Sequence, residues 1–318
     1  MAAKARTALL ALAVAAAIQA GEADSLFNLA NGYMARKEYD LAVETYDRVL
    51  KADPDFAQAP LALYRKAWCL NAQERFADAE TVLVGLLETH AKAEVEPKAL
   101  HLLGLARLKQ SKDAEGAAAL LELVEKHPKY ASAPGALHRA AEALYKIGRH
   151  KDAAAAYAKL AEGYPDYKLA PHIYYSLGWA HLQLKAYDAA AEAFATVVAK
   201  FPKSEVAAES QYKVGEARLE AKAYDQAVAA FQKTIDAFPG DYADDALLGI
   251  GRAQFEQGQY AKAAKTFLSL PERFPKSPEK PRAVYDGGNS LFYAEDYTAA
   301  LAAFDRVIAT APRPVEPA

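Results

Sequence analysis

The sequence has 318 residues, 53% of them hydrophobic, and a formal net charge of −3, which allows a large core and argues against a nucleic-acid-binding protein. Its one cysteine, Cys69, excludes an intrachain disulfide and a zinc site made of several cysteines. The 16 glycines and 16 prolines are too few to indicate a disordered chain.

The first 20 residues have the layout of a secretory signal peptide. Lys4 and Arg6 precede a short apolar run over residues 8–18, and small residues follow. The run is about half of the ~20 residues that a membrane-spanning helix needs. We therefore expect export to the bacterial periplasm, with cleavage after Ala20 or, alternatively, after Ala23; an uncleaved amphipathic or anchoring helix is the other interpretation. No cysteine stands directly after the run, so the sequence does not predict a lipoprotein.

The remainder of the chain, residues 21–318, contains a repeated pattern from about residue 23 to residue 314, followed by a short proline-rich tail. A proline closes most copies, at Pro54, Pro128, Pro165, Pro202, Pro239, Pro275 and Pro312. These positions are multiples of 37 apart, except for one step of 36 after Pro239. Fifteen residues before each closing position stands Tyr39, Phe76, Asp113, His150, Tyr187, Tyr224, Tyr260 or Tyr297. A fixed period of this size predicts a solenoid, here of eight copies.

Each copy is expected to form two helices, because apolar residues recur at helical spacing on both sides of the tyrosine position. The closing proline stops the second helix, and another proline opens the first helix at Pro60, Pro97, Pro134, Pro171 and Pro281. Two columns are always small and are expected to face each other. The first column is Ala30, Ala67, Gly104, Ala141, Gly178, Gly215, Gly251 and Gly288, and the second is Ala42, Ala79, Gly116, Ala153, Ala190, Ala227, Ala263 and Ala300. A bulky apolar residue four positions after the second column should fill the groove beside that contact.

This pattern resembles the tetratricopeptide repeat. The pairs Leu103–Gly104 and Leu177–Gly178, the tyrosine, the alanine, the aromatic residue and the final proline have that family's spacing. The resemblance implies an all-α, right-handed superhelical solenoid of eight hairpins. The usual repeat has 34 residues, so three extra residues are expected before the next helix, as a longer loop or as a helix that starts one turn early behind a Ser204 cap.

Repeats with the sequence "FPKSEVAAES" are similar to the repeat domains of the Tol–Pal-associated division coordinator and of the repeat lipoprotein in the barrel-assembly machinery. This resemblance implies a non-enzymatic scaffold or assembly factor of the bacterial cell envelope. In arrays of this type the first helices line the concave face. Positions there that differ between copies are the candidates for partner binding, because positions shared by all copies serve packing.

One variable column of the first helix contains both tryptophans, Trp68 and Trp179, and tryptophan is favoured at interfaces. The filling of a local packing gap is an equal alternative for each. Charge also varies on this face, with a basic middle that includes Lys98 and an acidic following part that includes Glu209, Asp245 and Glu256. We predict that a protein or peptide partner contacts Trp68, Trp179, Lys109, Arg139, Lys146, Glu216, Glu220 and Arg252.

A mostly aromatic column of the first helix is expected to pack in the core, with an aromatic binding ladder as the alternative. It consists of Phe27, Tyr64, His101, His138, Tyr175, Tyr212, Leu248 and Tyr285. Some adaptors of this repeat type bind a C-terminal carboxylate through a lysine and two asparagines. Asn31 matches one asparagine, but Phe27 and Arg65 replace the other two residues, so no such clamp is predicted.

No motif predicts an enzyme, a cofactor or a metal site. His101 and His138 occupy equivalent positions, but no cysteine or clear carboxylate completes a metal set, and no glycine-rich phosphate loop is present. One alternative function is a self-assembling structural protein, joined through the last repeat. Another is an accessory module or hydrolase acting on envelope polymer, which a carboxylate pair with raised pKa in a deep pocket would favour.

Pro271 lies eleven residues after Tyr260, inside the expected second helix of the seventh copy. A proline there removes a helix hydrogen bond and clashes with the preceding turn. We expect a kink or a helix end near Leu270 and a local change in superhelical pitch. The 36-residue step is expected in the loop before this copy.

Overall fold

The computed structural model describes residues 21–310, and within this range the chain forms helices joined by turns, with no strand. The all-α prediction is confirmed. The expected signal peptide, residues 1–20, and the proline-rich tail lie outside the described residues. The chain divides into two compact units, and the boundary between Ala156 and Tyr157 falls inside a helix.

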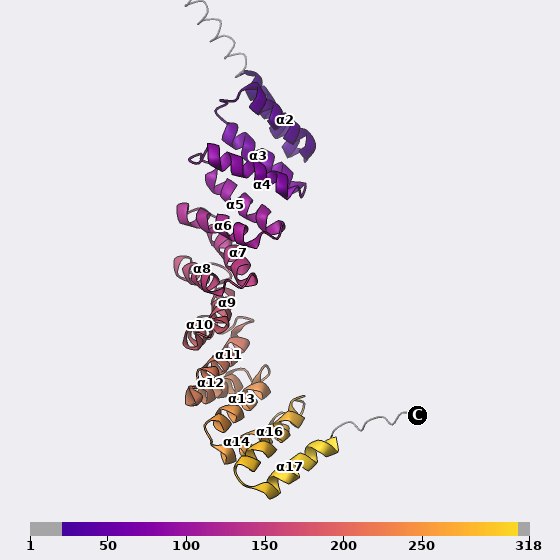
Figure 1. The fold of residues 1–318 in the computed structure, drawn as a ribbon, viewed down its shortest axis with the longest axis vertical. Coiled ribbons are helices and arrows are strands. Elements are labelled where there is room, and N and C mark those ends of the chain that lie inside the picture. Colours follow the sequence, from indigo (N-terminus) through magenta and orange to yellow (C-terminus); the bar gives the residue numbers. More distant parts are fainter. Residues whose placement is uncertain (1–20, 311–318) are drawn as a thin grey trace, which may run out of the picture. The chain divides into compact units, whose positions relative to one another are not determined.

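Unit 1 begins with a helix over residues 21–35. It continues with α2 (Tyr39–Ala52), α3 (Ala59–Ala72), α4 (Phe76–Thr89), α5 (Glu96–Lys109), α6 (Asp113–Lys126) and α7 (Ala133–Lys146). Helix α8 (His150–Gly163) crosses the boundary. From α2 to α7 each helix packs against the next one in the chain, so the unit is a stack of hairpins (Figure 1).

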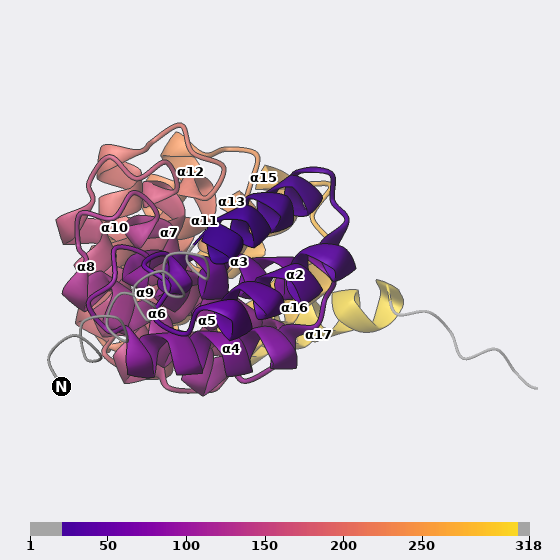
Figure 2. The same ribbon diagram turned by 90° about the horizontal axis from the view of Figure 1, so that it is seen from above.

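Unit 2 contains α9 (Ala170–Gln183), α10 (Tyr187–Lys200), α11 (Ala207–Glu220), α12 (Tyr224–Ala237) and α13 (Ala243–Glu256). It ends with α14 (Tyr260–Leu268), the short α15 (Leu270–Arg273), α16 (Lys280–Tyr293) and α17 (Tyr297–Thr310). Neighbours in the chain again pack on each other, except that α14 rather than the single-turn α15 makes the main contact with α16. Within this unit, α11 and α13 lie on the inner side and α10 and α12 on the outer side (Figure 2).

The second helix of each hairpin begins at the tyrosine position, from Tyr39 in α2 to Tyr297 in α17. The turn before it contains a residue with positive φ, at Lys37, Glu74, Ser111, Gly148, Lys185, Lys222, Gly258 and Glu295. In the first hairpin the backbone N–H of Glu38 donates to the carbonyl of Tyr33 at 2.9 Å, and the N–H of Lys37 donates to the carbonyl of Met34 at 3.0 Å. These two bonds form a Schellman motif, which ends the first helix. The sequence did not reveal this turn, because lysine, glutamate or serine fills most of its left-handed positions.

The two small columns face each other as predicted. A Cβ added to Gly104 on α5 would lie 3.2 Å from the carbonyl oxygen of Gly116 on α6 and 2.5 Å from Cγ of Leu120. The bulky residue fills the adjoining groove, as with Phe194 beside Gly178 and Phe231 beside Gly215. Small residues therefore let the two helices approach closely, and one large side chain closes the gap.

The three extra residues per repeat lie in the loop between hairpins. Helix α10 ends at Lys200 and α11 begins at Ala207, so a six-residue loop separates them. The alternative of an early helix capped by Ser204 is wrong, because Ser204 lies in this loop and its hydroxyl makes no hydrogen bond. The five opening prolines stand in the first turns of α3, α5, α7, α9 and α16, as predicted.

The seventh repeat departs from the others at both expected places. Between α12 and α13 the loop has five residues instead of six, and its last residue, Tyr242, has a left-handed φ of 59°. Helix α14 ends at Leu268, and the separate turn α15 begins at Leu270. The predicted helix end near Leu270 is confirmed, and it follows from the missing N–H of Pro271. The change in superhelical pitch stays a prediction.

Candidate functional site

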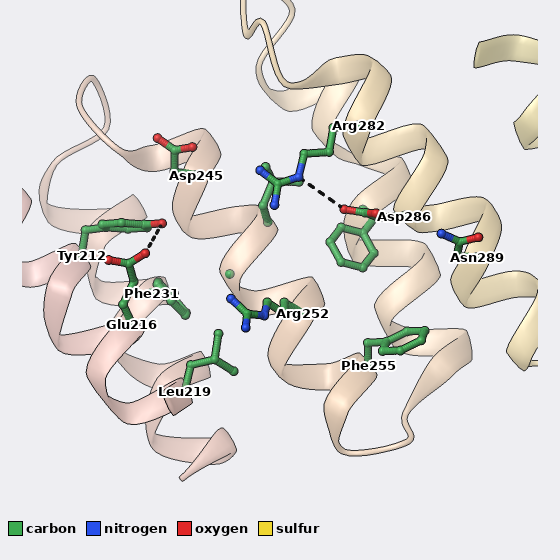
Figure 3. Close-up of a pocket in the computed structure, with 13 residues that line it drawn as sticks. Tyr212, Glu216, Leu219, Phe231, Asp245, Arg252, Phe255, Arg282, Asp286 and Asn289 are labelled. Atoms are coloured by element: carbon green, nitrogen blue, oxygen red, sulfur yellow. Dashed lines mark hydrogen bonds and ion pairs between the residues drawn. The ribbon is translucent and has the colours of Figure 1, made fainter. Parts of the chain in front are cut away.

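A cavity of about 400 Å³ opens between the inner helices of unit 2 (Figure 3). Its walls come mainly from α11, α13 and α16, the first helices of three consecutive repeats. It is lined by Tyr212, Glu216, Leu219, Phe231, Asp245, Leu248, Gly249, Arg252, Phe255, Phe267, Arg282, Asp286 and Asn289. This mixture of aromatic, aliphatic and charged groups in a concave site is typical of a ligand-binding surface.

Gly249 explains why the cavity opens at this repeat. The equivalent position is Arg139 in α7 and Lys213 in α11, so a long side chain extends from the inner face in those repeats. A Cβ added to Gly249 would lie 2.6 Å from the ring of Phe231, which comes from the outer helix α12. Helix α13 can pack closely on that ring because Gly249 has no side chain, and the space above it stays open.

One wall of the cavity is acidic, and we call Tyr212, Glu216 and Asp245 the acidic wall. The Tyr212 hydroxyl donates to the Glu216 carboxylate at 3.1 Å, and Lys213 Nζ donates to the other oxygen of Glu216 at 2.6 Å. The Tyr212 ring stacks on Tyr242 with a centroid distance of 5.5 Å and an interplanar angle of 21°. The left-handed Tyr242 of the shortened loop therefore helps to hold the acidic wall.

Asp245 and Asp286 are the two carboxyl groups with altered acidity in this cavity. Burial raises the pKa of Asp245, and the nearby Asp244, Glu279 and Glu216 raise it further, against the opposing charge of Arg282. Burial also raises the pKa of Asp286, which Arg282 lowers and Glu279 raises. At Asp245 the neighbouring carboxylates outweigh Arg282, whereas at Asp286 the raised pKa is due mainly to burial.

The two arginines of the cavity already have carboxylate partners. Arg282 lies 3.7 Å from Asp286 and 3.4 Å from Glu279, and Figure 3 shows it extending toward the acidic wall. Arg252 lies 3.3 Å from Glu220, one helical turn after Glu216. Both arginine side chains are more than half exposed, so each pair holds its arginine weakly.

Four of the predicted partner-binding residues lie close together in unit 2. Glu216 and Arg252 line the cavity, and Glu220 pairs with Arg252. Trp179 joins the set through Lys213, whose Nζ lies 4.6 Å from the centre of the indole ring and also pairs with Glu216. Trp179 makes edge contacts with Tyr175 and Phe194 as well, so its ring serves packing and is partly covered by Lys213.

The other four predicted residues lie in unit 1. Trp68 on α3 is half-buried and makes an edge contact with Tyr39 at 5.8 Å. Lys109 on α5 and Arg139 on α7 are exposed, whereas Lys146 pairs with Asp113 at 2.7 Å. Basic side chains are thus present on the first helices of unit 1, and one of them, Lys146, already forms an ion pair.

The aromatic column packs largely as predicted, except in the last repeat, where Tyr285 is 50% exposed. Phe27 and Leu248 are buried, and Tyr175 and Tyr212 contact Phe194 and Phe231. Tyr212 also lines the cavity, so in this repeat the packing column contributes to the candidate site.

The residues at the positions where a carboxylate clamp would lie have partners within the protein. Asn31 accepts hydrogen bonds from the Tyr46 hydroxyl at 2.7 Å and from Arg65 Nη1 at 2.6 Å, and Arg65 lies over the Phe27 ring. The amide oxygen of Asn31 is therefore used inside the array.

Sequence reasoning missed Arg282, Asp286 and Tyr242. A signal for Arg282 was present, because it occupies the column of Lys98, Glu209 and Asp245, whose charge varies between copies. No signal pointed to Tyr242, since its place on the acidic wall depends on the shortened loop.

Within residues 21–310, no group of three or more potential metal-ligating side chains comes together. The Cys69 thiol is buried, which raises its pKa to about 11. The pKa of His101 is lowered by burial and then by Arg139, and its ring makes an edge contact with Tyr130.

In the described part of the chain no helix combines the length and the apolar character needed to cross a membrane.

Models of the tetratricopeptide repeat match the chain over most of its length. One model matches residues 101–168, 138–205, 175–242 and 285–317, and two others match residues 218–280 and 23–56. The chain therefore belongs to the tetratricopeptide repeat family. No curated protein matches the sequence.

Several solved structures align with this chain at low sequence identity. A chain of the Naa15/Naa10 complex bound to HypK-THB aligns with a TM-score of 0.66 and 15% identity, over 92% of this chain and 42% of its own length. The TPR2AB-domain:pHSP90 complex of yeast Sti1 aligns with a TM-score of 0.44 and 16% identity, over 88% and 99% of the two chains. YrrB, described as a TPR protein with an unusual peptide-binding site, has a TM-score of 0.44 and 20% identity, over 62% and 94%. The chain thus spans less than half of the Naa15/Naa10 chain that it matches.

Proposed function

We propose that this protein is an exported, non-enzymatic scaffold of the bacterial cell envelope that binds a protein or peptide segment on the inner face of its first helices. Tetratricopeptide repeat proteins act as protein- or peptide-binding scaffolds. The observation that carries the proposal is the cavity of unit 2, where the inner columns of three consecutive repeats form one concave, mixed-charge surface.

The predicted partner-binding residues lie in both units. Glu216, Glu220, Arg252 and Trp179 lie in or beside the cavity. Trp68, Lys109, Arg139 and Lys146 are proposed to bind a further part of the partner on unit 1, where the basic side chains would favour an acidic segment.

Site-specific cross-linking tests the binding face. A photoreactive amino acid at Asn289, on the cavity wall, should capture a partner when the protein is expressed in a Gram-negative host. The matched control is the same amino acid at Gln226, which is exposed on the outer helix α12. Capture at both positions alike, or at Gln226 alone, would contradict binding on the inner face.

Export is proposed from the layout of residues 1–20. N-terminal sequencing of protein recovered from the periplasm should give a start at Gly21 or Asp24. Recovery from the cytosol with the first 20 residues attached would contradict export.

A hydrolase or accessory module acting on envelope polymer is a second candidate, favoured by Asp245 and Asp286, two carboxyl groups with raised pKa at one cavity. If it holds, purified protein should release soluble fragments from peptidoglycan, and both Asp245→Asn and Asp286→Asn should abolish the release. If the wild-type protein releases none, this candidate fails.

Self-association is a third candidate, favoured by the apolar surface of the last repeat. Tyr297, Leu301 and Ile308 on α17 are 59%, 63% and 71% exposed. In α14 the residue equivalent to Leu301 is Ala264, which is 1% exposed. Light scattering over a range of concentrations should show an increase in mass that Leu301→Glu removes; a constant monomer mass would contradict self-association.

A further inference from the structure

Tyr212, Glu216 and Asp245 set the electrostatic character of the cavity in unit 2. Its lining has three carboxylates, Glu216, Asp245 and Asp286, and two guanidinium groups, Arg252 and Arg282. Negative charge is therefore in excess even before the surrounding residues are considered.

The existing ion pairs leave one carboxylate of the lining without a partner. Arg252 is matched by Glu220, and Arg282 is shared between Glu279 and Asp286. Glu216 is matched by Lys213. The carboxylate of Asp245 has no ion pair or side-chain hydrogen bond within residues 21–310, and it is half-buried at the cavity edge. The charge left without a partner is thus an anion.

The array already contains one example of how such a surface holds a cation. The ammonium group of Lys213 lies over the Trp179 ring at 4.6 Å and 5.7 Å from the centre of the Tyr212 ring, while pairing with Glu216 at 2.6 Å. An aromatic ring beside a carboxylate attracts a cation through its quadrupole and through charge together. On the cavity side of Tyr212, Asp245 supplies a carboxylate with no such cation.

We propose, on the basis of the binding function proposed above, that the cavity of unit 2 takes a basic side chain, arginine or lysine, from a protein or peptide partner. Its charged group lies against the acidic wall, with Asp245 as the principal counter-charge and Tyr212 beside it. The aliphatic stem of the basic side chain packs on Leu219 and Leu248, which line the same cavity.

The negative potential at this site supports the assignment. Burial raises the pKa of Asp245, and three further carboxylates, Asp244, Glu279 and Glu216, raise it against Arg282. An incoming cation relieves this repulsion, whereas an incoming carboxylate adds to it. The groups facing Asp245 from α11, α13 and the start of α16 are thus acidic apart from Arg282.

The test uses pools of capped hexapeptides in which one position is fixed as arginine, lysine, norleucine or glutamate and the other positions are uncharged. Binding to the full chain is measured by calorimetry in dilute salt. The arginine and lysine pools should bind at least about tenfold more tightly than the norleucine and glutamate pools, and 0.5 M salt should remove most of the difference. Equal binding of the pools, preference for glutamate, or no binding of any pool would overturn the proposal.

Two variants locate the effect. Asp245→Asn should reduce the advantage of the arginine pool at least about fivefold, while Asp305→Asn on the outer helix α17 makes the same charge change away from the cavity and should leave it unchanged. Melting temperatures of both variants confirm folding. If Asp245→Asn binds like the wild type, the assignment is wrong.

Capture of a partner at Asn289, together with no preference for the basic pools, would overturn this inference and leave the proposed binding function standing. Failure of both experiments would overturn both proposals.

Discussion

Gly104 on α5 faces Gly116 on α6 so closely that a Cβ added to either one would lie 3.2 Å or 3.1 Å from the carbonyl oxygen of the other. This contact shows why every copy of the repeat has a small residue in both columns. In this hairpin the backbones themselves meet, so there is no room for a larger side chain, whereas the first copy has a methyl group in both columns, at Ala30 and Ala42.

We therefore expect Gly104→Ala to lower the free energy of unfolding by about 1–3 kcal/mol, because the methyl group also overlaps the Leu120 side chain. Gly85 on α4 is the matched control, since a Cβ there meets nothing within 4 Å. Gly85→Ala should raise stability by about 0.5–1 kcal/mol through helix propensity. Urea denaturation measures both; a stabilising Gly104→Ala would contradict the close helix contact.

The left-handed turn inside each hairpin gives a second prediction. Lys222 has a φ of 59° and Gly258, at the equivalent position of the next hairpin, has a φ of 73°. Lys222→Gly should stabilise the protein by about 0.5–1 kcal/mol, because it removes the strain of a side chain in this conformation. Gly258→Ala should destabilise it by about 1 kcal/mol. Thermal melting compares the two, and a shift of both variants in the same direction would argue against this turn geometry.

Glu80 on α4 provides a stability change that depends on pH. Its carboxylate accepts hydrogen bonds from Arg107 at 2.8 Å, Lys112 at 2.6 Å and Gln110 at 3.0 Å. Burial alone would raise the pKa of Glu80, but the bonds from Lys112, Arg107 and Gln110 outweigh it and lower the pKa to about 2. Since the pKa in the folded state is below its usual value of 4.5, the ionised group stabilises the fold above that value and loses this effect as the pH falls toward 2.

Glu80→Gln should accordingly cost about 1–2 kcal/mol at pH 7, and the difference from wild type should shrink between about pH 5 and pH 2. Glu88→Gln, at an exposed position of the same helix, should change little. Denaturation curves at several pH values measure the difference. A cost for Glu80→Gln that stays constant with pH would show that the ionised form has no special role.

Lys213 covers the ring of Trp179, which predicts a change in fluorescence. In a Trp68→Phe background Trp179 is the remaining tryptophan, since the sequence has two. Lys213→Ala should shift its emission to longer wavelength and increase quenching by acrylamide, because the indole ring becomes more exposed. Lys203→Ala, on an exposed loop residue, is the control. Unchanged quenching in Lys213→Ala would contradict the cation–π contact.

The hairpins could be predicted from the sequence because their packing residues recur in every copy. Tyr39 and its equivalents begin the second helices, and Gly104 and Gly116 meet, as their columns indicated. The candidate site could be predicted only in part. Glu216 and Arg252 were identified from variable columns, but Gly249, which lines the cavity, and Tyr242, which stacks on the acidic wall, are features of one repeat.

The physical reason is that a repeat pattern specifies contacts within a hairpin, whereas the inner surface depends on how neighbouring hairpins pack. The loop before α13 is one residue shorter than the others, and its last residue, Tyr242, stacks on Tyr212. Sequence columns do not predict this contact. The exposure of Trp179 could not be predicted for the same reason, because Lys213, which covers its ring, belongs to the next repeat.

Hydrogen–deuterium exchange of the full chain with the arginine hexapeptide pool tests the central claim most directly, namely that ligands bind on the first-helix face of unit 2. The account predicts slower exchange in α11, α13 and α16, at residues 207–220, 243–256 and 280–293, with little change in the outer helices α12 and α17. Protection confined to α12 and α17, or no protection anywhere in unit 2 at saturating peptide, would contradict it.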